Sequence, residues 1–299
     1  MSKRSHGKQL QRDRARRRAS TMERKRTRTK IVVLIMAGLM VLSLFGAALG
    51  GIIGAEEQAP PPPDDPEPVA RAEPCPPDDA APEVDSGIYD EPPLADLDPD
   101  ATYHVTVETT CGDVTIELDT AGAPLASANL VGLAEDGYYD GVEFHRVVDG
   151  FVVQVGDPAG TGCGQADCSP EGFDPDAPTY PGYTFEDELD TARALFDEVR
   201  AELAELLEDA GTDDVDADSI PGGYPRGTVA MANRGPDTNG SQFFVAQGEQ
   251  VVLEAPAFTV LGQVIDGMDV VDRIAGQAVD QLGRPLDPVR IITVRVDQR

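Results

Sequence analysis

The chain has 299 residues, and 40% of them are hydrophobic, which is enough for a folded core and excludes a wholly disordered protein. Its 54 acidic residues against 24 basic ones give a formal net charge of −30, so the bulk of the chain would repel a phosphate backbone. We therefore expect no nucleic-acid partner. Three histidines and four cysteines argue against a structural zinc site, and we expect no bound metal.

Residues 1–30 form a basic tail that holds 13 of the 24 basic residues and only two acidic ones. A run of arginines at 16–18 could form a nucleic-acid patch. A topology signal held near anionic lipid headgroups is the simpler interpretation, and we favour it. The tail is predicted to be cytoplasmic.

Residues 31–55 contain no charged residue. A helix of that length crosses the roughly 30 Å hydrocarbon core of a bilayer. Basic residues precede it and Glu56 and Glu57 follow it, so the N-terminus is expected in the cytoplasm. A cleaved signal peptide has a shorter apolar stretch of about 7–15 residues. The sequence therefore predicts an uncleaved, single-pass anchor in the cell membrane, with the rest of the chain extracytoplasmic.

Residues 56–100 contain 13 prolines, 15 acidic residues and one basic residue. Such a segment has too little apolar surface to offset its ordering entropy. We predict a disordered linker, partly polyproline II, that at about 3.1 Å per residue reaches on the order of 100 Å from the membrane. A proline-motif ligand is the less favoured alternative.

From residue 101 the pattern becomes that of a folded domain. The spacing of apolar and turn residues predicts two hairpins, at 103–118 and 143–155. It also predicts two helices, at 124–137 and 268–276, and a final strand at 289–296. Several short strands with two helices favour a mainly β fold, a closed or nearly closed barrel with helices over its ends. Closure would leave no exposed sheet edge.

Residues 188–222 are predicted to be an insertion with one amphipathic helix. Its apolar stripe is formed by Leu195, Phe196, Val199, Leu203, Leu206 and Leu207. Such a stripe usually packs onto the body, and docking of a partner stays an alternative. The aspartates at 213–218 lack the glycine and glutamate of a calcium loop, so we interpret them as a solvated acidic loop.

Two sequence stretches are more informative about function than the spacing of apolar residues. The first is FHRVVDGFVVQVGD at 144–157, and the second is MANRGPDTNGSQFF at 231–244. Both resemble signature stretches of the cyclophilin family of peptidyl-prolyl isomerases, and FTVLG at 258–262 is similar to a third run of that family. The resemblance extends over residues 101–297 without the insertion.

The resemblance implies a closed eight-stranded antiparallel barrel capped by two helices, with a substrate groove along one outer face. It implies that Arg146 is the catalytic residue. The residues implied to bind substrate are Phe151, Val152, Phe244 and Leu253 in a proline pocket, Phe258 on its wall, and Gln154, Ala232, Asn233 and Gln242 as groups that hold the peptide. The reaction breaks no covalent bond, so it requires no cofactor.

Simpler interpretations exist for these residues taken singly. Phe151 and Phe244 alone would be core residues, and a glutamine often satisfies buried backbone groups. Set within the full motifs, functional roles are favoured. We interpret His145 as structural or as a pocket neighbour, because this isomerisation transfers no proton.

The sequence departs from the family pattern at three points. Val155 stands where a glycine is usual, and Arg234 adds charge and bulk beside the groove. The chain has no tryptophan, so the indole with which many relatives grip cyclosporin is absent.

The four cysteines allow three full pairings, with free thiols as an alternative. Disulfides persist outside the cytoplasm. Because Cys163 and Cys168 are close in sequence within a glycine-rich loop, we favour a local bridge between them. Cys75 would then pair with Cys111 and tie the linker to the first hairpin.

Together these features predict a membrane-anchored peptidyl-prolyl isomerase that assists the folding of exported proteins. Its partners would be proline-containing peptides and unfolded exported chains, and we expect a monomer. A cyclophilin-like module that binds proline-containing peptides with little turnover, or that serves as a scaffold, is the alternative.

Overall fold

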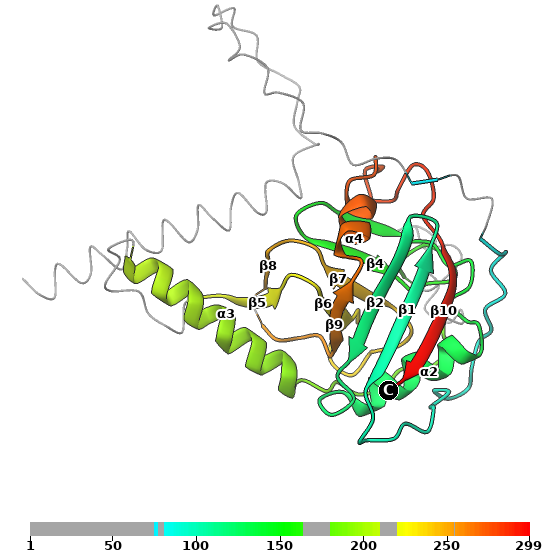
Figure 1. Cartoon of the computed structure of the whole chain (residues 1–299), viewed down its shortest axis with the longest axis horizontal. Helices are drawn as coiled ribbons and strands as arrows, with labels where there is room; N and C mark the ends of the chain where they lie inside the picture. Colours follow the sequence, from blue (N-terminus) through cyan, green and yellow to red (C-terminus); the bar gives the residue numbers. More distant parts are fainter. Residues whose placement is uncertain (1–74, 77–80, 164–179, 210–219, 254) are drawn as a thin grey trace, which may run out of the picture. The chain divides into compact units, whose positions relative to one another are not determined.

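The computed structural model describes residues 75–76, 81–163, 180–209, 220–253 and 255–299 (Figure 1). The basic tail, the predicted anchor at 31–55 and the first part of the linker lie outside the described residues. Among the helices of the described part, none combines the length and apolar character that crossing a bilayer requires.

The domain is mainly β, with one eight-stranded antiparallel sheet in the order β10-β1-β2-β9-β6-β7-β4-β3 (Figure 1). Its strands are β1 (Tyr103–Thr109), β2 (Gly112–Leu118), β3 (Arg146–Val148), β4 (Val152–Val155), β6 (Thr228–Met231), β7 (Phe243–Ala246), β9 (Val260–Asp266) and β10 (Ile291–Gln298). The two predicted hairpins and the final strand are confirmed.

The prediction of a closed barrel was wrong, because the sheet is an open half-barrel. Its edge strands β3 and β10 share no ladder. The segments that precede them are joined by an isolated bridge between Glu143 and Arg290 and by backbone hydrogen bonds, such as that from the Phe144 amide to the Val289 carbonyl at 2.9 Å. The free side of β3 is occupied by a loop instead, since the Val147 amide donates to the Gly283 carbonyl at 2.7 Å. This contact protects an edge that closure would otherwise have removed.

The two predicted helices are present as α2 (Pro124–Glu135) and α4 (Met268–Ala275). Proline begins α2, where its fixed φ suits the first turn and its missing N–H leaves no donor unsatisfied. The Glu188 carboxylate accepts hydrogen bonds from the Leu125 and Ala126 amides at 3.0 and 2.9 Å. An anion at this end of a helix stabilises it, so the start of the insertion also caps α2.

Alternation along the strands gives the domain two cores. The main core lies inside the half-barrel and includes Val153 and Phe243. The second core lies on the other face of β4, β6 and β7 and includes Val152 and Phe244. Successive residues of a strand point to opposite faces, so neighbours in the sequence contribute to different cores.

The inserted helix α3 (Asp190–Asp209) covers the second core together with a two-stranded sheet of β5 (Gly222–Pro225) and β8 (Gln250–Leu253) (Figure 1). The rings of Phe196 and Tyr224 meet edge to face at 5.3 Å between centroids. Packing of the predicted stripe is confirmed for Phe196 and Val199, which are buried, whereas Leu206 is 63% exposed.

Residues 81–100 lie against the domain, although we predicted them as part of a disordered linker. The Tyr89 amide donates to the Pro181 carbonyl at 2.7 Å, and the Ala95 amide donates to the Ala128 carbonyl at 3.0 Å. Proline fixes φ and so reduces the entropy lost on ordering such an extended segment. The folded domain therefore begins earlier than predicted, and we call residues 81–100 the strap.

A disulfide fastens the chain ahead of the strap. Cys75 is bonded to Cys111, in the turn between β1 and β2, as predicted. Cys163 is also disulfide-bonded, and its predicted partner Cys168 lies outside the described residues.

Candidate functional site

One row of side chains crosses four neighbouring strands on the outer face of the sheet. Arg146 on β3 pairs with Gln154 on β4, Gln154 pairs with Phe244 on β7, and Phe244 pairs with Ala230 on β6. Directly opposed residues of an antiparallel ladder project to the same face. The register therefore brings a cation, an amide, an aromatic ring and a methyl group together.

Arg146 presents its guanidinium beside an aromatic ring at one end of this row. The guanidinium carbon lies 5.7 Å from the centroid of the Phe151 ring, within the range of a cation–π contact. Burial lowers the pKa of the Arg146 guanidinium. Within the described ranges, no hydrogen bond or ion pair involves this side chain. Its donors are therefore partly desolvated and open to a ligand.

The residues of the predicted proline pocket gather in the second core. Val152 and Phe244 are buried there, and Phe151, Leu253 and Phe258 are partly buried at its border. The rings of Phe244 and Phe258 meet at 88° with their centroids 5.4 Å apart. An edge-to-face pair of this kind is a favourable aromatic geometry, so the two rings hold each other in place.

Tyr224 is a member of this cluster that the sequence analysis missed. Its ring centroid lies 6.3 Å from that of Phe244. Its hydroxyl donates to the Phe258 carbonyl at 2.9 Å and lies 3.2 Å from the Phe258 amide. Tyr224 follows the insertion directly in the sequence, and its place opposite Phe258 depends on the pairing of β5 with β8, for which no local pattern exists.

The polar residues form a separate cleft of about 50 Å³, lined in part by Gln154, Ala232, Asn233 and Gln242. The Gln154 amide donates to Gln242 Oε1 at 3.0 Å. The Ala232 amide donates to the Gln242 carbonyl at 2.9 Å. Gln154 belongs to both the outer-face row and the cleft, so it connects Arg146 and Phe244 to the polar residues of the cleft.

Asn233 and Arg234 lie on the rim of the cleft. The side-chain amide of Asn233 donates to the Ala257 carbonyl at 2.7 Å, which ties the loop before Phe258 to the cleft. Arg234 is exposed, and its Nη1 donates to the Cys163 carbonyl at 2.9 Å. A positive charge therefore stands at the rim, as the sequence indicated.

Val155 and His145 both lie inside the domain. Val155 is 1% exposed in the main core, and the next residue, Gly156, takes the positive φ of 98°. His145 is 4% exposed, and burial lowers its pKa to about 4. It is therefore neutral near pH 7, which agrees with its interpretation as a structural neighbour of the site.

No group of three or more histidine, cysteine, aspartate or glutamate side chains able to hold a metal ion occurs among the described residues.

Comparisons with known proteins identify the family of this chain. The family model described as cyclophilin type peptidyl-prolyl cis-trans isomerase/CLD matches residues 104–296. Peptidyl-prolyl cis-trans isomerase CYP18-2 of Arabidopsis thaliana is 33% identical over 192 residues, which cover 64% of this chain and 92% of that protein.

A second relative is peptidyl-prolyl cis-trans isomerase-like 3 of Gallus gallus, 35% identical over 64% of this chain and 94% of that protein. A crystal structure of a Cryptosporidium parvum cyclophilin type isomerase aligns at 25% identity and a TM-score of 0.48, over 66% of this chain and 99% of that one. On the family match and the curated relatives, the chain belongs to the cyclophilin family of peptidyl-prolyl cis–trans isomerases.

Proposed function

We propose that the chain isomerises X–Pro bonds in exported proteins at the outer face of a cell membrane, with Arg146 as the catalytic residue. The observation that carries the catalytic assignment is the partly buried guanidinium, which lies over Phe151 and has no hydrogen-bond or ion-pair partner among the described residues. A desolvated cation without a partner is costly to a fold, so its retention beside an aromatic pocket favours a function.

The chemistry requires little more than such a donor. Rotation about an X–Pro amide has a barrier of about 18–20 kcal/mol, from the partial double-bond character of its C–N bond. In the twisted transition state conjugation is lost, and the prolyl nitrogen becomes a better hydrogen-bond acceptor. A fixed guanidinium directed at that nitrogen binds the transition state more tightly than the ground state, which is the condition for catalysis.

The aromatic pocket and the polar cleft would hold the two sides of the rotating bond. The pyrrolidine ring fits against Phe151 and Phe244, whose faces are apolar and rigidly packed. Gln154 and Gln242 lie beside this pocket and offer amide groups to the peptide backbone. These contacts with the peptide on either side of the rotating bond then hold the amide next to Arg146.

Exchange spectroscopy by NMR tests this function. The purified chain, at a catalytic concentration, is added to a short Ala-Pro peptide, and we expect the cis and trans signals to exchange faster than the spontaneous rate of tens to hundreds of seconds. Binding shifts without faster exchange would instead support the alternative, a proline-binding module with little turnover.

The extracytoplasmic location is proposed on two sequence features and one structural one. The 25 uncharged residues at 31–55 follow a basic tail, as in a membrane anchor with a cytoplasmic N-terminus. The disulfide between Cys75 and Cys111 favours an oxidising compartment. Proteolysis of intact cells should remove the isomerase domain and leave a short anchored fragment. Protection until the cells are lysed would contradict this location.

A further inference from the structure

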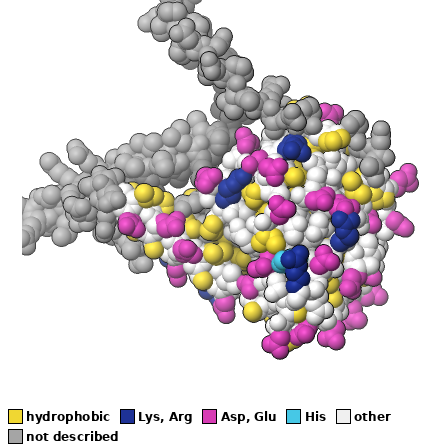
Figure 2. Space-filling view, viewed as in Figure 1, with side chains coloured by type: hydrophobic (Ala, Val, Ile, Leu, Met, Phe, Trp, Pro, Cys, Tyr) yellow, Lys and Arg dark blue, Asp and Glu magenta, His cyan; other side chains and the backbone are white. Residues whose placement is uncertain are grey.

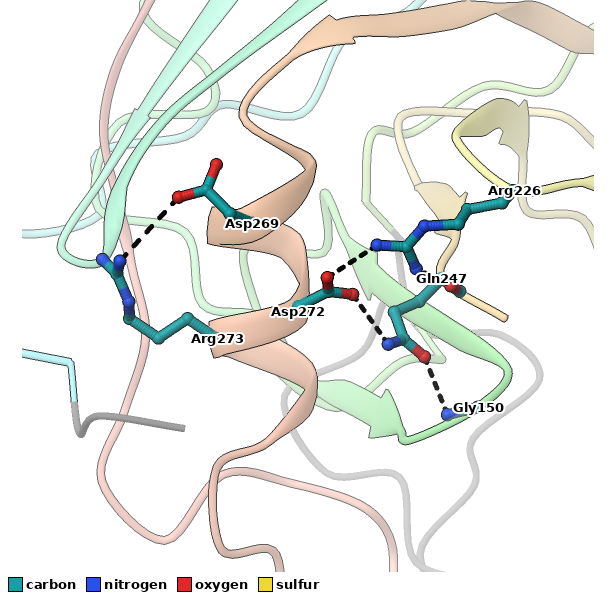
Figure 3. A network of polar contacts seen from close by, with 6 residues as sticks. All are labelled: Gly150, Arg226, Gln247, Asp269, Asp272 and Arg273. Atoms are coloured by element: carbon teal, nitrogen blue, oxygen red, sulfur yellow. Dashed lines mark hydrogen bonds and ion pairs between the residues drawn. The ribbon is translucent and has the colours of Figure 1, made fainter. Parts of the chain in front are cut away.

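Gln247 joins the site to helix α4 through a set of hydrogen bonds that the proposed chemistry does not use (Figure 3). It follows β7, and its side-chain oxygen accepts from the Gly150 amide at 2.7 Å. Its side-chain nitrogen donates to Asp272 Oδ1 at 2.9 Å. The Gln247 side chain therefore connects an exposed turn, 97 residues away in the sequence, to a helix that is 25 residues away.

The turn that Gln247 holds leads directly into Phe151. The Phe151 carbonyl accepts from the backbone amides of Gln247 and Gly248 at 2.8 and 3.2 Å. Gly248 allows this approach, because a Cβ there would lie 2.2 Å from the Gly150 carbonyl oxygen. Side chain and backbone together fix the turn before and after the Gly150–Phe151 peptide bond.

Asp272 is in turn held by a cation. Arg226 Nη2 donates to Asp272 Oδ2 at 2.6 Å, and Arg226 Nη1 donates to the Gln247 carbonyl. Burial raises the pKa of Asp272, but the bonds from Arg226 and Gln247 outweigh it and lower the pKa overall. The carboxylate is therefore ionised near neutral pH and accepts from both neighbours, so the orientation of the Gln247 amide is determined.

We propose that Gln247 is a positioning residue that fixes Phe151 and, through it, the guanidinium of Arg146. Phe151 is the ring over which Arg146 lies and is also part of the pocket border. A shift of the turn would move both at once, and misplacement by about 1 Å can lower a rate as much as 100-fold. This inference rests on the proposed function, since it assigns Arg146 and Phe151 the roles given above.

The same helix offers a matched control. Asp269 and Arg273 form an ion pair of 3.9 Å on α4 that does not reach the turn at Gly150 (Figure 3). Asp269→Asn removes a carboxylate from α4 as Asp272→Asn does, yet should leave the site unchanged. Any effect of losing charge on α4 in general would appear in both variants.

The experiment compares the full chain with Gln247→Ala, Gln247→Glu, the double variant Gln247→Glu/Asp272→Asn and Asp269→Asn. Each is assayed for kcat and KM on the Ala-Pro peptide, for its urea unfolding midpoint and for the NMR shift of Arg146 Nε–Hε. Gln247→Ala should lower kcat about tenfold with little change in KM, and should move the Arg146 resonance.

Gln247→Glu alone places a carboxylate beside Asp272 and should also lose activity. The double variant restores the bridge with reversed polarity, because the side-chain amide introduced by Asp272→Asn would donate to the new carboxylate, which still accepts from Gly150. It should recover at least half of the lost kcat. A kcat that follows the Arg146 resonance and not the urea midpoint across the variants separates positioning from a purely structural defect. If Gln247→Ala does not fold, the comparison of Gln247→Glu with Gln247→Glu/Asp272→Asn tests the proposal instead.

Wild-type kcat and an unmoved Arg146 resonance in Gln247→Ala would overturn the positioning role, as would failure of the double variant to recover activity. Arg146→Ala is measured alongside. Retention of activity in Arg146→Ala would instead overturn the proposed function, so the two failures are distinguishable.

Discussion

At the scale of single residues, the site places two neighbours in opposite environments. Arg146 lies on β3 in the outer-face row, whereas His145, just before the strand, is buried. The pKa of each is lowered chiefly by burial. The histidine therefore stays neutral to a more acidic pH, whereas the arginine remains charged near pH 7. We therefore expect the protonation of His145 to affect stability at acidic pH.

The pH dependence of unfolding tests the environment of His145. Its pKa falls from 6.5 to about 4 on folding, so the unfolded state binds more protons between these values. The contribution of His145 is fully present above pH 6.5 and is lost as the pH falls towards 4. The difference corresponds to about 3 kcal/mol in the free energy of unfolding.

Urea unfolding at pH 7 and pH 4 measures this loss, and His145→Gln provides the reference because it does not titrate. The wild type should lose more stability than the variant on acidification. Equal losses in the two proteins would show that His145 is not protonated on unfolding.

How much of the site could be predicted depends on where each residue lies in the sequence. Arg146, Gln154 and Phe244 belong to continuous motifs, so the resemblance placed them on one face before the register was known. Tyr224 could not be found in this way, because its contact with Phe258 arises from pairing of two short strands that flank the insertion and the site loop. Long-range pairing of this kind leaves no local signal.

At the scale of elements, the composition of the strap led to a wrong prediction of disorder, whereas the apolar spacing of α3 predicted its buried face correctly. The apolar period of α3 identified its buried face, since Phe196 and Val199 follow helical spacing. The strap has no period, and its many prolines and acids are typical of a linker. It is ordered by a few specific contacts, such as the Tyr89 ring at 5.9 and 6.4 Å from those of Tyr138 and Tyr183.

Gly132 in α2 provides a test of the strap. Alanine is usually better than glycine in a helix by about 1 kcal/mol. Here a Cβ would lie 1.9 Å from the Pro93 carbonyl oxygen of the strap, which is backbone and cannot simply rotate away. Gly132→Ala should therefore destabilise the domain by about 1–3 kcal/mol, as overpacking does.

Thermal unfolding and limited proteolysis measure this effect. Gly132→Ala should lower the midpoint and expose the strap to cleavage, whereas Glu135→Ala, at an exposed position of the same helix, should do neither. A higher midpoint for Gly132→Ala would mean that the strap does not contact α2.

At the scale of the whole molecule, the excess of acidic residues is distributed over the surface. Figure 2 shows acidic side chains spread over the visible face, with few basic ones among them. Several arginines of the described residues are paired, as Arg226 is with Asp272 and Arg290 with Glu143, both at 2.6 Å. Most of the negative charge is therefore not neutralised locally, and self-repulsion opposes the compact state.

Added salt should stabilise the chain by screening this repulsion. Between about 0.02 and 0.5 M sodium chloride the Debye length falls well below the spacing of distant surface charges. The thermal midpoint should rise by a few degrees, and equally in sodium chloride and potassium chloride, because screening depends on ionic strength and not on the identity of the cation. A midpoint that falls with salt would mean that surface ion pairs outweigh the repulsion.

The central claim, that the Arg146 guanidinium stabilises the twisted amide rather than the bound peptide, is tested most directly by measuring both quantities in one NMR titration. For Arg146→Ala, we predict an exchange rate constant on the bound enzyme lower by about 100-fold or more. The peptide Kd should change by less than about threefold, because the donor acts mainly in the transition state. An unchanged rate constant, or a loss of rate explained entirely by weaker binding, would contradict the account.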